Sequence, residues 1–266
     1  MPDRRRTSLT YSTRSLHGQV AHDIGGRILR GDLAPGAVLP NEADFSARLR
    51  VSRTALREGI KVLAAKGLVE SRPKTGTRVR PRADWNLLDP DVLAWQMAAG
   101  PLERFVEELF ELRQMIEPQA AAIAARRAGA AEVRRIEQAY LGMKQAGNDS
   151  TRWIEPDLRF HQAIIRATGN ELLWPLGAII ETALTASFRL SSAGWDGPVH
   201  SLPLHKAILD AIRRRDATAA GAAMRRLLAD AAADARRALA NGRPKPSRRG
   251  RASQRPIDEE GRYDVR

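Results

Sequence analysis

The 266-residue sequence contains no cysteine, which excludes disulfide bonds and any metal site built on thiolates. No apolar run is long enough to span a membrane, and the N-terminus, MPDRRRTSLT, lacks the apolar core of a signal peptide. These absences predict a soluble, cytoplasmic protein that makes no membrane contact. Hydrophobic residues still make up 43% of the chain, which is enough for the cores of two modest domains.

Charge is distributed unevenly along the chain. Residues 1–82 contain 17 Lys+Arg against 7 Asp+Glu, whereas residues 83–242 contain 19 against 20. The last segment, residues 243–266, is again basic, with 8 against 4. A basic first domain is typical of proteins that bind the phosphates of nucleic acids. The C-terminal segment lacks apolar periodicity and contains Pro, Gly and Ser, so we expect a disordered basic tail over residues 242–266.

Residues 39–79 read LPNEADFSARLRVSRTALREGIKVLAAKGLVESRPKTGTRV, a pattern that predicts two short helices followed by a β-hairpin. Asn41 and Ser52 can cap the two helices, and the second helix should end at Lys66 and Gly67. Its expected buried face consists of Val51, Ala55, Leu56, Ile60, Leu63 and Ala64. With an amphipathic helix over residues 16–30, this pattern indicates a winged helix-turn-helix.

Polar and basic residues occupy the start of the second of these helices and the hairpin tip. An arginine at an exposed helix start can pair bidentately with guanine O6 and N7 in the major groove, and a glycine lets the hairpin backbone approach phosphates closely. A small helical domain whose arginines only solvate its surface is the alternative. The predicted DNA-binding residues are Ser52, Arg53, Thr54, Arg57, Lys61, Lys74, Thr75 and Gly76.

The segment SRTALREGIKVLAAKGLVESRPKTGTRV resembles the GntR family of bacterial transcription factors. The resemblance implies a DNA-binding winged helix-turn-helix. One departure is visible, because the family often has an arginine after the glutamate of its second helix and this chain has Ala43. One common DNA contact is therefore expected to be missing or replaced.

From Leu102 onward the sequence is helical almost without interruption and carries no strand signal, which predicts an all-α bundle of six helices. The expected inner stripe of its first helix consists of Leu102, Phe105, Val106, Leu109, Leu112, Ile116, Ala120 and Ile123. The fold class is therefore mainly α, with an N-terminal winged helix-turn-helix followed by a helical bundle. The expected boundaries are residues 14–80 for the DNA-binding domain, 81–100 for an ordered linker and 101–241 for the bundle.

Three residues of the bundle could form a polar site. Asp157 and His161 are four residues apart and share a helix face, and His205 lies on a later helix that could meet them. A carboxylate and two imidazoles suit a divalent metal such as zinc, nickel or manganese. From spacing alone, a hydrogen-bonded triad without metal or a set of surface residues is the more common outcome.

ELFELRQMIEPQAAAIAARRA, PDLRFHQAIIRATGN and LHKAILDAIRRRDATAAGAAMRRLL resemble the FCD ligand-binding domain of the FadR-type GntR subfamily. The resemblance implies a metal held by Asp157, His161, His205 and a fourth histidine. At the fourth position this chain has Leu227, which cannot ligate a metal. We therefore expect a weak or incomplete metal site, or an effector bound directly by the triad. His200 could substitute, but Gly and Pro nearby favour a loop.

Arg113 matches an arginine of the first FCD helix that often faces the pocket, where it could clamp a carboxylate bidentately. The alternative role for Arg113 is an ion pair with Glu117, four residues on. WNLLDPDVLAW also resembles a narrower group, the galactonate-operon repressors, which sense sugar acids. The expected effector-binding residues are Arg113, Asp157, His161 and His205.

Together these features predict a DNA-binding transcriptional regulator, a repressor of a catabolic operon that a small carboxylic or sugar acid releases. Its expected partners are a double-stranded DNA operator, that effector and a second copy of the chain in a homodimer. Two other functions remain open from the sequence: a metal-dependent hydrolase using Asp157, His161 and His205, and an architectural DNA-binding protein without an effector. The absence of a further general base argues against the hydrolase, so we predict that the chain is not an enzyme.

Overall fold

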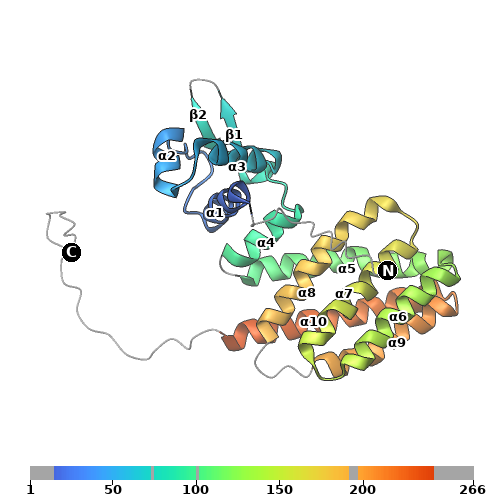
Figure 1. The fold of residues 1–266 in the computed structure, drawn as a ribbon. Coiled ribbons are helices and arrows are strands. Elements are labelled where there is room, and N and C mark those ends of the chain that lie inside the picture. Colours follow the sequence, from blue (N-terminus) through green and yellow to red (C-terminus); the bar gives the residue numbers. More distant parts are fainter. Residues whose placement is uncertain (1–14, 73–74, 100–101, 192–196, 243–266) are drawn as a thin grey trace, which may run out of the picture.

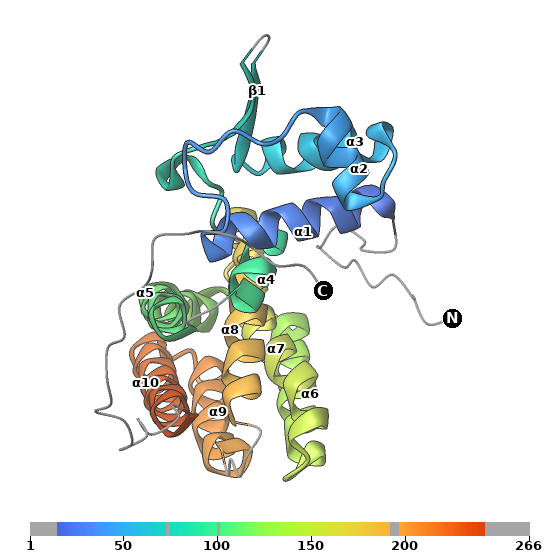
Figure 2. The same cartoon turned by 90° about the vertical axis from the view of Figure 1, so that its left-hand side faces the viewer.

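The computed structural model describes residues 15–72, 75–99, 102–191 and 197–242. A small N-terminal unit with a two-stranded wing lies beside a larger bundle of helices, and helix α4 lies between them (Figures 1 and 2). The mainly α fold class is confirmed. Within the described residues, no helix has the length and hydropathy that crossing a bilayer requires.

The N-terminal unit is a winged helix-turn-helix. Its helices are α1 (Leu16–Arg30), α2 (Glu42–Leu49) and α3 (Arg53–Ala65). The side chains of Asn41 and Ser52 accept hydrogen bonds from backbone N–H groups in the first turns of α2 and α3, as the sequence predicted. The wing consists of β1 (Val69–Arg72) and β2 (Gly76–Val79), an antiparallel pair that places Val69 opposite Val79. Val38 adds a single bridge to Arg78.

The core of this unit differs in part from the stripe expected along α3. Leu56 and Leu63 are fully buried, but Ala64 is exposed, and Gly59 and Val62 take up the inner face instead. Gly59 is required there because a Cβ at this position would lie 2.7 Å from a methyl carbon of Val20 on α1. The buried face is therefore rotated from the expected stripe by the close packing of α1 on α3.

The linker is ordered and packs against both the winged unit and the bundle. It contains η1 (Arg82–Asp84) and α4 (Pro90–Ala99), so the expected short helix from Pro90 is present. Trp95 packs into the core of the winged unit, directly against Gly25 of α1, where a Cβ would lie 2.4 Å from the indole ring. Leu93 packs against α5 and α8, and Met97 against α5 and α10. A helix whose side chains pack into both halves therefore joins the two cores.

The bundle contains six α-helices over the described part of the chain. They are α5 (Leu102–Arg127), α6 (Ala130–Ala146), α7 (Ser150–Ala167), α8 (Gly177–Ser191), α9 (Gly197–Arg213) and α10 (Ala217–Gly242). The short 3-10 helix η2 (Glu171–Leu176) precedes α8. Helices α5 and α10 pack along each other, as do α6 and α7, with α9 next to α10 (Figure 2). The predicted tail lies largely outside the described residues.

The inner face of α5 also differs from the expected stripe. Val106, Leu109 and Ala120 are buried, but Ile116 and Ile123 are only partly so. The fully enclosed positions between them are occupied by two charged residues, Arg113 and Glu117, which are 2% and 1% exposed. A charged pair in the middle of an apolar helix face is the feature that leads to the site.

Candidate functional site

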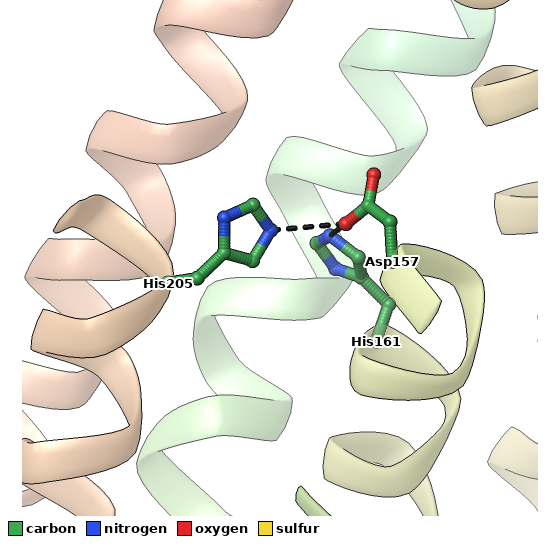
Figure 3. Close-up of side chains that lie close together, drawn as sticks. All are labelled: Asp157, His161 and His205. Atoms are coloured by element: carbon green, nitrogen blue, oxygen red, sulfur yellow. Dashed lines mark hydrogen bonds and ion pairs between the residues drawn. The ribbon is translucent and has the colours of Figure 1, made fainter. Parts of the chain in front are cut away.

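Asp157, His161 and His205 meet inside the bundle, where α7 and α9 pack against α5 and α10 (Figure 3). His205 Nε2 lies 2.9 Å from Asp157 Oδ1, and His161 Nε2 lies 3.4 Å from the same oxygen. All three residues are buried. The three side chains, whose meeting the spacing allowed and the resemblance implied, are therefore close together.

Both imidazole rings are held by a second partner on their other nitrogen. His205 Nδ1 lies 2.8 Å from the backbone oxygen of Ser201, and because a carbonyl can only accept, Nδ1 carries the hydrogen. His161 Nδ1 lies 2.5 Å from Glu117 Oε2. Each ring therefore turns its Nε2 atom toward Asp157, the arrangement that orients histidines at metal and anion sites.

Arg113 and Glu117 extend this cluster across α5. Arg113 Nε donates to Glu117 Oε1 at 2.5 Å, so the ion pair weighed as the alternative role for Arg113 is present. The pair leaves part of the guanidinium free, because the buried Arg113 Nη1 has no hydrogen-bond partner among the residues that the structure describes. A buried N–H group without a partner is costly, and an anionic ligand is one group that would satisfy it.

The buried charges shift one another's pKa values. Burial alone would raise the pKa of Glu117, but Arg113 and His161 outweigh it and hold that pKa at about 2. Burial would also raise the pKa of Asp157, and its hydrogen bonds with the two histidines lower it instead. Burial would lower the pKa of His161, yet Glu117 and Asp157 raise it to about 9. At neutral pH, Arg113 and His161 are therefore cations opposite two carboxylates.

A cavity of about 90 Å³ opens beside the cluster. Arg113, Asp157, His161 and His205 line it together with Leu227, the residue at the position of the missing histidine. The volume suits a small organic molecule or several waters rather than a long acyl chain. The remaining lining residues are Trp153, Leu184, His200, Ser201, Leu204, Leu228, Asp230, Ala231, Asp234 and Ala235.

His200 lies in the first turn of α9 and not in the loop that its neighbours Gly197 and Pro198 suggested. Helix α9 begins at Gly197, and proline is well suited to the first turn of a helix because its missing N–H has no intrahelical acceptor there. His200 is exposed and lines the cavity, but it is not part of the cluster of potential ligand atoms formed by Asp157, His161 and His205.

The triad fits a divalent metal in the nature and orientation of its donors. One carboxylate oxygen and one nitrogen from each histidine lie within 4.8 Å of one another. With His205 Nδ1 already donating to Ser201, Nε2 is the ring nitrogen that faces Asp157 and that a metal shared with this carboxylate would use. Leu227 supplies no fourth ligand, so any bound metal would keep open positions for water or an anion.

The residues expected to bind DNA lie on the surface of the winged unit. Ser52, Arg53, Thr54, Arg57 and Lys61 are all exposed along α3, and Thr75 and Gly76 are exposed at the wing. Lys74 falls outside the described residues. Ala43, which replaces the expected arginine, is exposed in the first turn of α2.

Two contributors to the site were not identified from the sequence. Glu117 was considered only as a partner of Arg113, whereas it also binds His161, 44 residues away. Ser201 contributes through its backbone oxygen, a group that every residue has, so the residue type gives no signal of this role. A charged i,i+4 pair on an otherwise apolar helix face was the one available signal for Glu117.

Comparison with known proteins gives a family match for each half of the chain, the winged unit and the helical bundle. The family model "Bacterial regulatory proteins, gntR family" matches residues 16–79, and the "FCD domain" model matches residues 108–230. The Escherichia coli K12 galactonate operon transcriptional repressor is 34% identical over 204 residues, covering 75% of this chain and 88% of that protein. The uncharacterized HTH-type transcriptional regulator YieP of the same organism is also 34% identical over 204 residues, covering 76% and 87%.

A solved structure shares the fold at lower sequence similarity. It is that of Lar, described as controlling the expression of the Listeria monocytogenes agr system, at 16% identity and a TM-score of 0.61. The alignment covers 85% of this chain and 99% of that one. That likeness concerns the fold alone, whereas the two family matches and the two relatives at 34% identity place the chain in the GntR family of bacterial transcriptional regulators, with a C-terminal FCD domain as in its FadR-type members; it is a DNA-binding regulator and not an enzyme.

Proposed function

We propose that this chain acts as a homodimeric repressor of a catabolic operon and is released from DNA by a small carboxylic acid. The observation that carries the proposal is Arg113, which lines a small, mostly apolar cavity and whose buried Nη1 has no hydrogen-bond partner among the described residues. A carboxylate placed there would gain a charge-assisted hydrogen bond and relieve the unpaired N–H group. In this assignment residues 14–80 bind DNA, 81–100 link the halves, and 101–241 bind the effector and dimerise.

A sugar acid suits the rest of the cavity. Its walls offer hydrogen-bonding groups from the triad and from Asp230 and Asp234 on α10, which could accept from ligand hydroxyls. The relative at 34% identity is the repressor of a galactonate operon, and galactonate is itself a sugar acid, which supports this ligand class. Held by Asp157, His161 and His205, a divalent metal would supply a further positive charge for the carboxylate.

DNA recognition is assigned to α3 and the wing. Arg53 and Arg57 would read base edges, and Ser52, Thr54, Lys61, Lys74, Thr75 and Gly76 would contact the sugar-phosphate backbone. Because one recognition helix reads few base pairs, we expect a two-fold dimer on a palindromic operator. We therefore expect the protein to act in the cytoplasm, where bacterial DNA is found.

Effector and DNA would be coupled by linkage. An acid that binds the cavity more tightly in a DNA-incompetent arrangement shifts the population toward that arrangement and lowers operator affinity. Helix α4 provides a physical connection, because Leu93 shares an apolar cluster with Ile179 and Ala183 of α8 while Trp95 lies in the winged unit's core. Helix α8 also contributes Leu184 to the cavity wall.

We expect Arg53→Ala and Arg57→Ala each to reduce discrimination for the operator by about 1–3 kcal/mol, the usual contribution of a bidentate arginine–guanine contact. The measurement compares binding to a duplex selected in vitro by the wild-type protein from a random-sequence pool with binding to a scrambled duplex of equal composition. Arg152→Ala, which changes an exposed arginine of α7, serves as the control. Unchanged discrimination in both α3 variants would refute the assignment of α3 to base recognition.

A screen of sugar acids and simple carboxylates, each with and without zinc, tests the effector site by thermal shift. A ligand that binds only the folded state should raise the melting temperature as its concentration increases. We expect Arg113→Lys to abolish most of that shift, because a lysine can pair with Glu117 but lacks the second nitrogen. Arg104→Lys changes an exposed arginine with the same i,i+4 glutamate partner on α5 and should leave the shift intact. Equal shifts in both variants would contradict the role of Arg113.

A further inference from the structure

Resting on the proposed reading of DNA by α3, we infer that Glu42 is a positioning residue for base recognition: it holds the guanidinium of Arg57 in place for one base of the operator. Glu42 is the first residue of α2, and Arg57 lies on α3. Arg57 Nε donates to Glu42 Oε2 at 2.7 Å. The pair therefore links the two helices of the helix-turn-helix at its exposed surface.

Both ends of this pair are anchored by rigid structure. Helix α2 is fixed by the Asn41 cap and by Phe45, whose side chain lies in the core of the winged unit. Helix α3 is fixed by the Ser52 cap and by the fully buried Leu56, the residue before Arg57. A hydrogen bond between two anchored helices restricts the arginine side chain more than a bond within one helix would.

The hydrogen bond leaves the base-reading part of Arg57 available. A guanidinium has five N–H donors, and the bond to Glu42 uses the one on Nε. Arg57 makes no other hydrogen bond with the residues that the structure describes, so both terminal nitrogens can donate to guanine O6 and N7. An arginine already held in one orientation loses less side-chain freedom on binding than a mobile one.

The other basic residues of α3 are placed differently. Lys61 pairs with Glu58, three residues before it on the same helix, so this pair fixes no geometry between helices. Arg53 is exposed in the first turn of α3. Of the arginines proposed to read bases, Arg57 is therefore the one that a carboxylate of another helix orients.

A carboxylate close to DNA has the opposite effect on non-specific binding, which does not depend on the base sequence. Glu42 repels phosphates, so it weakens electrostatic attraction to any duplex. Its side chain is 43% exposed, and an exposed ion pair contributes little to folding stability. If Glu42 positions Arg57, removing its charge lowers discrimination without lowering affinity for scrambled DNA. A loss of discrimination without a loss of affinity for scrambled DNA therefore distinguishes a positioning role from a structural one.

The experiment uses the full-length chain and duplexes that it selects from a random-sequence pool. We expect Glu42→Gln to bind the selected duplex with about 2- to 5-fold less discrimination over the scrambled duplex, the scale of an exposed ion pair. Affinity for the scrambled duplex should be unchanged or higher. Repeating the selection should show relaxed base preference at the same half-site position for Glu42→Gln and Arg57→Ala.

Two matched controls remove a carboxylate nearby. Glu58→Gln removes the same charge from α3, and Asp44→Asn removes one from the first turn of α2, where acidic residues also favour the helix dipole. Both should retain the wild-type base preference. In the double variant Glu42→Gln/Arg57→Ala, Glu42→Gln should cause no further loss of discrimination beyond that of Arg57→Ala, because the two residues act as one unit.

The inference would be overturned by full discrimination in Glu42→Gln, by the same loss in both controls, or by an additive loss in the double variant. A relaxed preference at a different position from that of Arg57→Ala would also refute it. If the wild-type chain selects no sequence, the proposed operator binding itself fails, and this inference fails with it. If Arg57→Ala relaxes one position and Glu42→Gln relaxes none, the proposed function stands and the inference alone is wrong.

Discussion

Replacing Glu117 with glutamine should lower the free energy of unfolding by about 3–5 kcal/mol, the usual cost of breaking a buried ion pair by removing one partner. Glu117 is 1% exposed and bonds Arg113 through one oxygen and His161 through the other. The neutral amide would leave the buried Arg113 guanidinium without its ion-pair partner, and it would remove the largest interaction that raises the pKa of His161. Urea denaturation at neutral pH, where His161 with its pKa of about 9 is protonated, measures this loss.

The same helix contains a matched control for Glu117. Arg104 and Glu108 form an i,i+4 pair with a Nε–Oε1 distance of 2.7 Å, and their side chains are 89% and 52% exposed. Because solvent screens such a pair, we expect Glu108→Gln to change the free energy of unfolding by no more than about 0.5 kcal/mol. Similar small losses in both variants would show that Glu117 does not stabilise the buried cluster.

Replacing Leu227 with histidine should increase the affinity for zinc or nickel by at least the roughly 10- to 100-fold that supporting hydrogen bonds contribute at metal sites. Leu227 is 4% exposed and lines the cavity together with Asp157, His161 and His205. An imidazole at this position on α10 would add a third nitrogen ligand to those of His161 and His205. We expect the unmodified chain, with three ligands, to retain well under one equivalent after dialysis against a mild chelator.

Metal analysis measures the equivalents of metal that the protein retains, and competition with a chromophoric chelator measures its affinity for the metal. Leu227→Gln is the control, because it introduces a polar side chain of similar length without an imidazole. A full equivalent retained by the unmodified chain and lost in His161→Ala would show that three protein ligands suffice. That result would make the metal, rather than direct hydrogen bonding by the triad, the anchor for an acidic effector.

The winged unit was largely predictable because its signals are local. Asn41 and Ser52 cap helices within three residues, and Gly67 ends α3 in a left-handed conformation, so short stretches of sequence determine these boundaries. The exact buried face of α3 was not predictable, because the steric requirement at Gly59 comes from Val20 on another helix. Rotating the stripe placed Val62 inside and Ala64 outside.

The site was predictable only where its residues share a helix. The spacing of Asp157 and His161 indicated a common face, and their meeting with His205 followed from resemblance to a known domain. The role of Glu117 depends on the packing of α5 against α7, which no local pattern encodes. His200 was wrongly expected in a loop because Gly and Pro were treated as helix breakers, although both occur at helix starts.

The most direct test of the account is the effect of a cavity ligand on DNA binding. Fluorescence anisotropy of the selected duplex should fall as galactonate or another acid identified by thermal shift is added to the wild-type complex. The same titration with Arg113→Lys should require a much higher concentration, while its affinity for DNA without effector stays near that of the wild type. Release of DNA at the same acid concentration by both proteins, or no release by any acid that stabilises the fold, would contradict effector control through this cavity.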